Sequence, residues 1–243
     1  MKVRARIGVI YPDDTWVDKD ILDYLEEFGR FLPPDVEMSS VHQYVRARDT
    51  TVEEGIWLSE SPDIEIAAQR LMRFDPDCIA HLCTTTSFIK GGGHDADISD
   101  RIESVTGVPA VTTSTAAIKA LRALGLKKIA TASPYLAEVN QRLTEFLEGN
   151  GFQVVNSTPL CLSRDHNLNP TGRIRRAAED ADRPEADGVF ISCTGQKTAG
   201  FISDLERKLG KPVVTANQAT MWCALRMVGI DPKLPGLGIL YGD

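Results

Sequence analysis

The sequence predicts an α/β protein built from two pseudo-symmetric flavodoxin-like αβα halves, each a parallel sheet with helices on both faces. Short apolar stretches alternate with amphipathic stretches along the chain, which is typical of βαβ units. This order repeats, with a turn at Gly125 between the two copies. In each copy an apolar stretch runs into a cysteine followed by a hydroxyl residue, at Cys83 and at Cys193. We therefore expect one active site in the cleft between the halves.

The first half contains four apolar runs bounded by proline, glycine or charged residues, which predict strands at residues 6–11, 36–45, 78–82 and 109–111. Apolar residues at helical spacing predict helices at residues 18–31, 62–74, 95–106 and 115–124. Residues 46–59 are charged and irregular around Trp57, which fits a loop or a short helix.

The second half repeats this pattern. Its predicted strands are residues 128–132, 152–160, 188–192 and 213–215, and its predicted helices are residues 136–148, 172–182, 199–209 and 219–228. We expect the last helix to pack on the first half, where residues 236–240 would add an edge segment. The predicted division is residues 1–117 plus 219–243 for the first half, with Cys83, and residues 118–218 for the second, with Cys193.

Composition narrows the function classes. The chain has 243 residues, 42% hydrophobic and 25% charged, with a formal charge of −7, which argues against a nucleic-acid or acidic-membrane partner. No apolar run is long enough for a membrane span, and residues 1–6 lead into a strand rather than a secretory signal. Five cysteines without a CxxC motif indicate free thiols. We therefore expect a cytoplasmic protein.

Cys83 and Cys193 are the candidate catalytic residues. A buried cysteine is usually a small hydrophobic residue, and Cys78, Cys161 and Cys223 fit that interpretation. Cys83 and Cys193 differ because each stands at the carboxyl end of a predicted strand, where doubly wound sheets place ligands. Because the two positions match across the halves, we expect a thiol on either side of one site.

A thiolate is both a base and a nucleophile, and its pKa falls when N–H groups face it. Two thiols on opposite faces of a planar intermediate can move a proton from one face to the other, which racemises a substrate. One thiol can instead add to a double bond and leave after rotation, or donate a proton in a decarboxylation. These reactions need no cofactor. The four histidines lack metal-ligand spacing, so we expect no metal.

Hydroxyl residues and glycine follow both cysteines, at residues 84–87 and at Thr194 and Gly195. Their O–H and N–H groups can hold a carboxylate and the enediolate that develops from it. Residues 13–15 (Asp-Asp-Thr) also follow a strand, but carboxylates there would repel an acid and would rather cap the next helix.

Five segments carry a resemblance to a known family: residues 83–88 (CTTTSF), 114–116 (STA), 121–125 (LRALG), 135–143 (YLAEVNQRL) and 192–195 (SCTG). Together they resemble the maleate isomerase and arylmalonate decarboxylase branch of the aspartate/glutamate/hydantoin racemase superfamily, over nearly the whole chain. The resemblance implies no cofactor and a small carboxylate that passes through an enediolate or a covalent thiol adduct. Cys83 would match the first cysteine of the isomerases and racemases, where the decarboxylase has glycine. Cys193 would match the thiol common to both.

The resemblance also implies substrate-binding residues: Thr84, Thr85, Tyr135, Asn167 and the N–H of Thr194. Gly195, beside Cys193, and Thr15, in the turn after the first strand, complete the predicted set of substrate-binding residues. One departure concerns the turn after the first strand, where maleate isomerases carry a Ser-Ser-Asn type sequence. This chain has Pro-Asp-Asp-Thr-Trp at residues 12–16, where Thr15 can donate a hydrogen bond and Trp16 can line an apolar pocket. The change leaves the identity of the acid open.

The leading hypothesis is a cofactor-independent isomerase or racemase of a small carboxylic acid or diacid that uses Cys83 and Cys193. The second is a decarboxylase of a malonate-like diacid with Cys193 as proton donor. The third is a carboxylate-binding module without turnover. A homo-oligomer is compatible with each of them.

Overall fold

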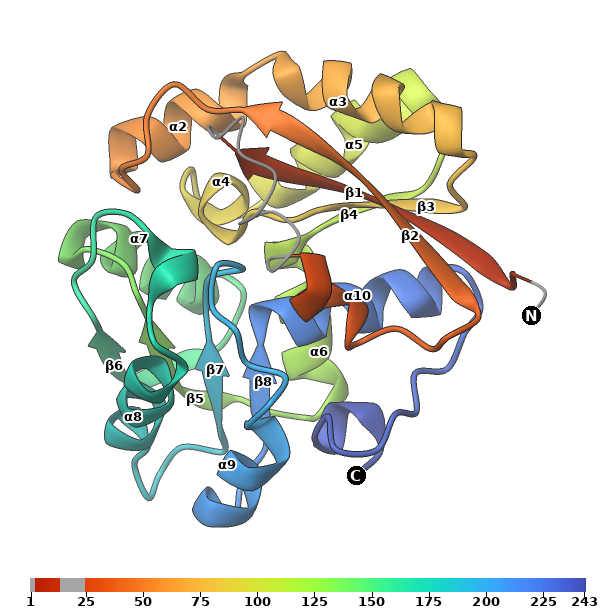
Figure 1. Cartoon of the computed structure of the whole chain (residues 1–243). Coiled ribbons are helices and arrows are strands. Elements are labelled where there is room, and N and C mark those ends of the chain that lie inside the picture. The colour runs from red at the N-terminus through yellow and green to blue at the C-terminus, as the bar shows by residue number, and fades with distance from the viewer. Residues whose placement is uncertain (1–2, 14–24) are drawn as a thin grey trace.

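The computed structural model describes residues 3–13 and 25–243, and its strands form two four-stranded parallel sheets (Figure 1). The strand orders are β2-β1-β3-β4 and β6-β5-β7-β8, so the second sheet repeats the first. The eight strands are β1 (Ala5–Asp13), β2 (Val36–Tyr44), β3 (Cys78–His81), β4 (Ala110–Thr112), β5 (Lys128–Ser133), β6 (Gln153–Pro159), β7 (Gly188–Ile191) and β8 (Val213–Thr215). This confirms the predicted fold class.

Helices connect the strands and cover the sheets, as right-handed βαβ crossovers require. They are α2 (Val52–Glu60), α3 (Asp63–Leu71), α4 (Thr84–Phe88), α5 (His94–Thr106), α6 (Thr113–Ala123), α7 (Ala137–Gly149), α8 (Thr171–Ala181), α9 (Ile202–Leu209) and α10 (Ala216–Met227), with 3₁₀ turns η1 (Met72–Phe74), η2 (His166–Leu168) and η3 (Ile239–Tyr241). Of the helix predicted over residues 18–31, the described part is helical at residues 25–29.

One inner strand of each sheet, β3 in the first and β7 in the second, positions the site. All four residues of β3 and all four of β7 are buried, because helices cover both faces of each sheet. β3 pairs with β1 and β4, and β7 pairs with β5 and β8. The residues that follow β3 and β7 therefore emerge from the middle of their sheets, at the carboxyl ends of the strands.

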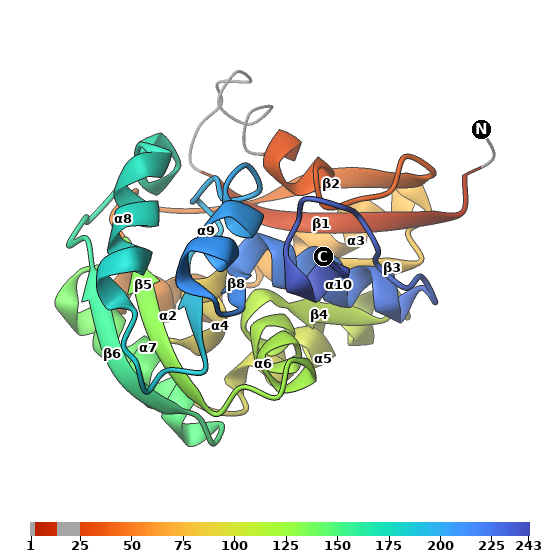
Figure 2. The same ribbon diagram turned by 90° about the horizontal axis from the view of Figure 1, so that it is seen from below.

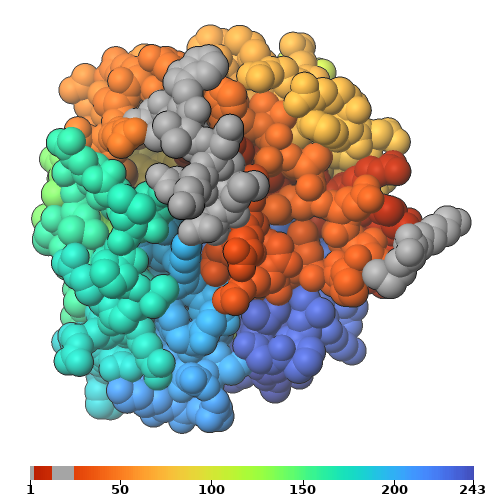
Figure 3. Space-filling view, in the orientation of Figure 1, coloured from red at the N-terminus to blue at the C-terminus, as the bar shows by residue number. Residues whose placement is uncertain are grey.

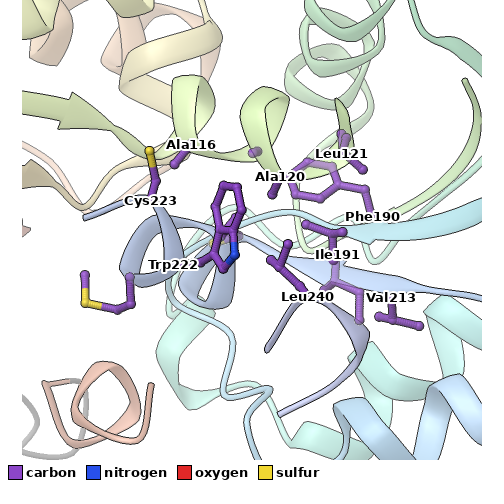
Figure 4. Packing of buried hydrophobic residues seen from close by; sticks show 14 of the residues in the cluster. Ala116, Ala120, Leu121, Phe190, Ile191, Val213, Trp222, Cys223 and Leu240 are labelled. Atoms are coloured by element: carbon purple, nitrogen blue, oxygen red, sulfur yellow. The ribbon is translucent and has the colours of Figure 1, made fainter. Parts of the chain in front are cut away.

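Helices α6 and α10 join the halves into one packed body. α10 lies against α6 and contacts β3 and β4 of the first sheet and β8 of the second (Figures 1 and 2). Figure 4 shows Trp222 of α10 beside residues of α6, β7 and β8 in one continuous hydrophobic cluster. The predicted boundaries between residues 117 and 118 and between 218 and 219 fall inside these two helices. The predicted division of the chain stays a prediction.

The structure corrects several predicted elements. Residues 84–87 form most of α4, a helix that was not among the predicted elements. Residues 236–240 add no edge strand, because the chain there ends in the 3₁₀ turn η3. β1 continues through Pro12, whereas its pairing with β3 ends at Ile10. The N–H that proline lacks is therefore not needed for a hydrogen bond to β3. α9 begins at Ile202 rather than at residue 199. Among the described residues, no helix is long and apolar enough to cross a membrane.

Candidate active site

A cavity of about 260 Å³ lies between the halves, at the carboxyl ends of β3 and β7. The first half contributes the end of β1, the segment from residue 45 through α2, and the start of α4. The second half contributes Tyr135, residues 165–168 and residues 193–195. The predicted site residues that line the cavity are Cys83, Thr84, Thr85, Tyr135, Asn167, Cys193, Thr194 and Gly195. Thr15 and Trp16 lie outside the described residues. The catalytic and binding roles of all these residues stay predictions.

Cys83 caps the N-terminus of α4 in extended backbone conformation. Its Sγ accepts hydrogen bonds from the Thr86 hydroxyl at 2.8 Å and from the Thr86 N–H at 3.5 Å. Burial raises the pKa of the Cys83 thiol, and the hydrogen bonds from Thr86 and Thr85 oppose that rise. The start of α4 thus supplies the donors that a thiolate at Cys83 would need.

Cys193 stands in a different backbone conformation. Its φ of +92° lies in the region that side chains with a Cβ rarely adopt, and it is one of four such non-glycine residues in the described chain. Burial raises the pKa of its thiol to about 12, while the Gly195 N–H lowers it. Strained backbone of this kind is concentrated at functional sites.

The two thiols also affect each other. A negative charge on Cys83 raises the pKa of Cys193, so ionising both at once is unfavourable. The favoured ionised state of the pair is therefore one thiolate and one thiol. This is the state in which one sulfur can accept a proton while the other donates one.

Tyr135 joins the two cysteine loops. Its phenol lies 3.3 Å from the Ser192 hydroxyl and also hydrogen-bonds the Thr85 side chain, so it contacts residues of both halves. Burial raises the pKa of Tyr135 well above its usual value, which keeps the phenol protonated. Its ring packs edge-on against Phe88 of α4 at a centroid distance of 5.8 Å. The phenol is therefore a fixed O–H group at the cavity.

The threonines differ in how their hydroxyls are used. The buried Thr84 hydroxyl has no hydrogen-bond partner among the described residues, so it is open to a bound acceptor. The Thr194 hydroxyl donates to the Leu82 carbonyl at 3.1 Å and thereby ties the second cysteine loop to the first. Asn167 lines the cavity, whereas Asn169 donates to the Gln196 side chain at 2.7 Å.

Several cavity residues were missed in the sequence. His166, set aside for lack of metal spacing, has its Nδ1 3.5 Å from the Cys193 Sγ. Trp57 and Arg46 also line the cavity, with the Arg46 guanidinium 4.9 Å above the Trp57 ring and paired with Glu53 and Glu54. The position of His166 next to Asn167 was the one signal available for it. Arg46 and Trp57 lie in the charged and irregular residues 46–59, whose sequence contains no pattern that indicates a site.

Two loops meet at the cavity from opposite halves. The Thr50 N–H donates to the Ser163 carbonyl, and Asp49 pairs with Arg164 at 3.3 Å. Figure 3 shows the orange surface of the first half meeting the blue-green surface of the second half along this line. These contacts join the two halves at the edge of the cavity. Within the described part of the chain, no three His, Cys, Asp or Glu side chains converge to hold a metal ion.

Comparisons with known proteins agree with this geometry. The arylmalonate decarboxylase family model matches residues 56–241, a segment that includes both cysteines. Arylmalonate decarboxylase of Bordetella bronchiseptica is 33% identical over 183 residues, which are 72% of this chain and 75% of that protein. Maleate isomerase of Geobacillus stearothermophilus is 25% identical over 253 residues, which cover 99% of this chain and 98% of that protein.

Solved structures of both enzymes have the same fold. A liganded double mutant of arylmalonate decarboxylase has a TM-score of 0.85 at 29% identity, covering 98% of this chain and 99% of that one. A cysteine-to-alanine variant of maleate isomerase from Pseudomonas putida S16 with maleate has a TM-score of 0.84 at 21% identity, covering 98% of each chain.

Proposed function

Because the chain belongs to the arylmalonate decarboxylase family, we propose that it is a cofactor-independent isomerase or racemase of a small carboxylic acid. Cys83 and Cys193 are the paired acid and base, or nucleophile and acid. One observation carries this proposal: two buried thiols from equivalent places in the two halves line one cavity, and charge on one raises the pKa of the other. By the family resemblance, the decarboxylases have glycine at the position of Cys83.

In the proton-transfer form of the reaction, donors from both halves hold the substrate carboxylate. These donors are the Thr84 and Thr85 hydroxyls, the Tyr135 phenol and the Thr194 N–H. The thiolate of one cysteine takes the proton from the carbon next to the carboxylate, and the C–H electron pair moves into an enediolate. The thiol of the other cysteine returns a proton to the opposite face. The donors that hold the carboxylate also stabilise the added charge of the enediolate.

In the covalent form, one thiolate adds to a carbon–carbon double bond and the other thiol protonates the neighbouring carbon. Rotation about the new single bond and reversal of both steps give the other isomer. The Nocardia farcinica maleate cis-trans isomerase, which has this fold at 20% identity, has been solved with a covalently bound succinylcysteine intermediate. The same pair of thiols serves both forms.

The cavity favours a small acid with an apolar substituent. Its volume of about 260 Å³ is that of roughly nine water molecules at liquid density. Val45, Trp57 and Leu58 supply apolar surface on the β2–α2 side of the cavity, between the charged residues Arg46, Arg48, Asp49 and Glu54. The carboxylate donors lie around the cysteines. We therefore expect the carboxylate at the thiols and the apolar substituent toward Trp57.

The second candidate is decarboxylation of a malonate-like diacid, and the 33% identity to arylmalonate decarboxylase favours it. In that reaction one carboxylate leaves as carbon dioxide, its bonding electrons form the enediolate, and the Cys193 thiol protonates the carbon. Cys83 has no step in this reaction.

One experiment separates the candidates. Small mono- and dicarboxylates are incubated with the protein in D2O and followed by NMR, using the unchanged chain, Cys83→Ser and Cys193→Ser. Proton-transfer isomerisation predicts deuterium at the carbon next to the carboxylate, and loss of activity in both variants. Decarboxylation predicts activity that survives Cys83→Ser. A ligand that raises the melting temperature while no acid is converted would contradict both and identify a binding module.

A further inference from the structure

His166 lies beside the Cys193 thiol, and no role for it follows from the two-thiol mechanism. Its Nδ1 is 3.5 Å from the Cys193 Sγ, within hydrogen-bond range for sulfur, and it lines the cavity that holds both cysteines. We infer that His166 exchanges a proton with Cys193 and so sets the protonation state of this thiol during turnover. Its part in turnover rests on the proposed function, whereas its effect on the thiol does not.

The hydrogen bonds of the ring fix which nitrogen carries the proton. His166 Nε2 lies 3.2 Å from the Leu162 carbonyl oxygen, which can only accept a hydrogen bond. In the neutral ring Nε2 must therefore hold the proton. Nδ1 then presents a lone pair to the Cys193 thiol and can accept its proton, which is the arrangement of a base beside a nucleophile.

Burial makes ionisation of either group alone unfavourable. Burial lowers the pKa of His166 and raises the pKa of Cys193 to about 12, so at neutral pH both are uncharged. A proton that passes from sulfur to nitrogen creates two opposite charges side by side and leaves the net charge of the cavity unchanged. Exchange within the pair would let the buried thiol ionise without adding a net charge to the cavity.

Some groups around His166 and Cys193 favour the charged forms of the pair, and others oppose them. Asp165 and the Leu162 carbonyl raise the pKa of His166, and the Tyr135 phenol hydrogen-bonds Cys193 and lowers its pKa. Charge on Cys83 opposes ionisation of Cys193. From the β2–α2 side, four further charged residues line the cavity: Arg46, Arg48, Asp49 and Glu54.

The segment that carries His166 is held against the Cys193 turn. The Gln196 side chain donates to the His166 carbonyl at 2.7 Å and accepts from Asn169. A Cβ at Gly195 would lie 3.0 Å from the His166 Cβ, so glycine permits this close approach. The Tyr135 ring packs edge-on against the imidazole at a centroid distance of 5.8 Å. These contacts hold the imidazole next to the Cys193 thiol.

The step balances within the pair. The S–H bond of Cys193 breaks, its electron pair stays on sulfur, and the proton forms a bond to Nδ1. Nε2 of the imidazolium keeps its proton and donates a hydrogen bond to the Leu162 carbonyl. The reverse step returns the proton to sulfur, and neither direction needs a further reactant.

Thiol reactivity tests the inference without any substrate. In a Cys83→Ser, Cys161→Ser background, iodoacetamide labelling of Cys193 is followed by peptide mass spectrometry from pH 6 to 11. With His166 present, Cys193 should react well below the pH expected for a lone buried thiol. In His166→Gln, whose amide can still donate to Leu162, the rate at pH 7 should fall at least tenfold and recover at high pH.

Two further variants complete the test. His166→Asn keeps a polar group near the sulfur but cannot accept the proton, so its labelling rate should equal that of His166→Gln. Recovery of the Cys193 labelling rate in His166→Asn would mean that His166 only positions the thiol. His94 is 12% exposed and does not line the cavity, so His94→Gln should match the background. Equal rates and pH profiles with and without His166 would overturn the inference. If no acid is converted at all, the proposed function fails while this measurement still decides the pairing.

Discussion

Cys83 and Cys193 each follow an inner strand of a four-stranded parallel sheet, β3 in the first half and β7 in the second. Their surroundings differ. Cys83 has extended backbone and accepts hydrogen bonds from Thr86 at the start of α4. Cys193 has a φ of +92° and faces the imidazole of His166.

The repeated fold places the two sulfurs at equivalent positions, and the loops around them determine how each thiol can ionise. The matching strands bring one sulfur from each half to the same cavity. The N–H and O–H donors at Cys83 stabilise a negative charge directly, whereas His166 offers Cys193 a place for its proton. The proposed mechanism needs the two thiols in opposite protonation states, and these surroundings would give each thiol a different means of changing its state.

The largest expected effect comes from replacing each cysteine by glycine. Either change should lower isomerase activity by roughly 10²–10⁴-fold, the usual contribution of a general acid or base. The stabilities should separate the two sites. At Cys83 the cap hydrogen bonds are lost and glycine adds unfolded-state entropy, at a cost of about 1 kcal/mol. At Cys193 glycine relieves the positive φ, so the loss should be at least about 1 kcal/mol smaller.

Activity assays and urea unfolding measure both quantities. Unfolding free energies that fall equally in the two variants would show that the backbone at Cys193 carries no strain. Isomerase activity retained in Cys83→Gly would contradict the two-thiol mechanism, and decarboxylase activity in that variant would support the second candidate.

Gly195→Ala tests the close packing at the second cysteine loop. The new Cβ would meet the His166 Cβ at 3.0 Å and the Asn167 N at 3.2 Å, so residues 166 and 167 must shift. We expect kcat/KM to fall roughly ten- to hundredfold, because small displacements of reacting groups are costly. Gly172→Ala is the matched control, since a Cβ there meets nothing within 4 Å. Unchanged kcat/KM in Gly195→Ala would argue against a role for this segment.

Acid should destabilise the protein through His81 of the first half, where the second half has Ile191. Burial lowers the pKa of His81 to about 3, against 6.5 in the unfolded chain. Between these values the unfolded state binds a proton that the folded state does not, so stability falls as pH falls, by about 1.4 kcal/mol per unit. From pH 7 to 5 the loss should be about 2 kcal/mol. Urea unfolding of His81→Gln should lack this loss; an unchanged pH dependence would contradict the assignment.

The smallest effect should come from Thr86→Val, which removes the hydroxyl that donates to the Cys83 thiol. Loss of one hydrogen bond to a charged acceptor should raise the pKa of Cys83 by about one unit, equivalent to about 1.4 kcal/mol. Alkylation of Cys83 at pH 7 should slow about tenfold, while Cys193 in the same sample should keep its rate. A parallel slowing at both cysteines would mean that the two thiols are not independently tuned.

The fold was predictable because its signals are local. Strands buried on both faces are continuous apolar runs, and all eight were found within a few residues of their bounds. The place of the two cysteines at one cavity was predictable because the carboxyl ends of parallel strands lie at one edge of the sheet. Helix α4 was not predictable, since four hydroxyl residues have weak helix propensity and its cap is a thiol.

Hydrophobic periodicity and chain order specify the two repeated sheets and bring Cys83 and Cys193 to one cavity, so both features could be derived from the residues alone. The surroundings of the two thiols depend on contacts that form only in the folded protein. His166 reaches Cys193 because Gly195 allows a close approach and Gln196 binds its carbonyl, while Trp57 reaches the cavity on a segment tied to the opposite half through Thr50. Contacts of this kind join residues far apart in the chain, so no local pattern encodes them.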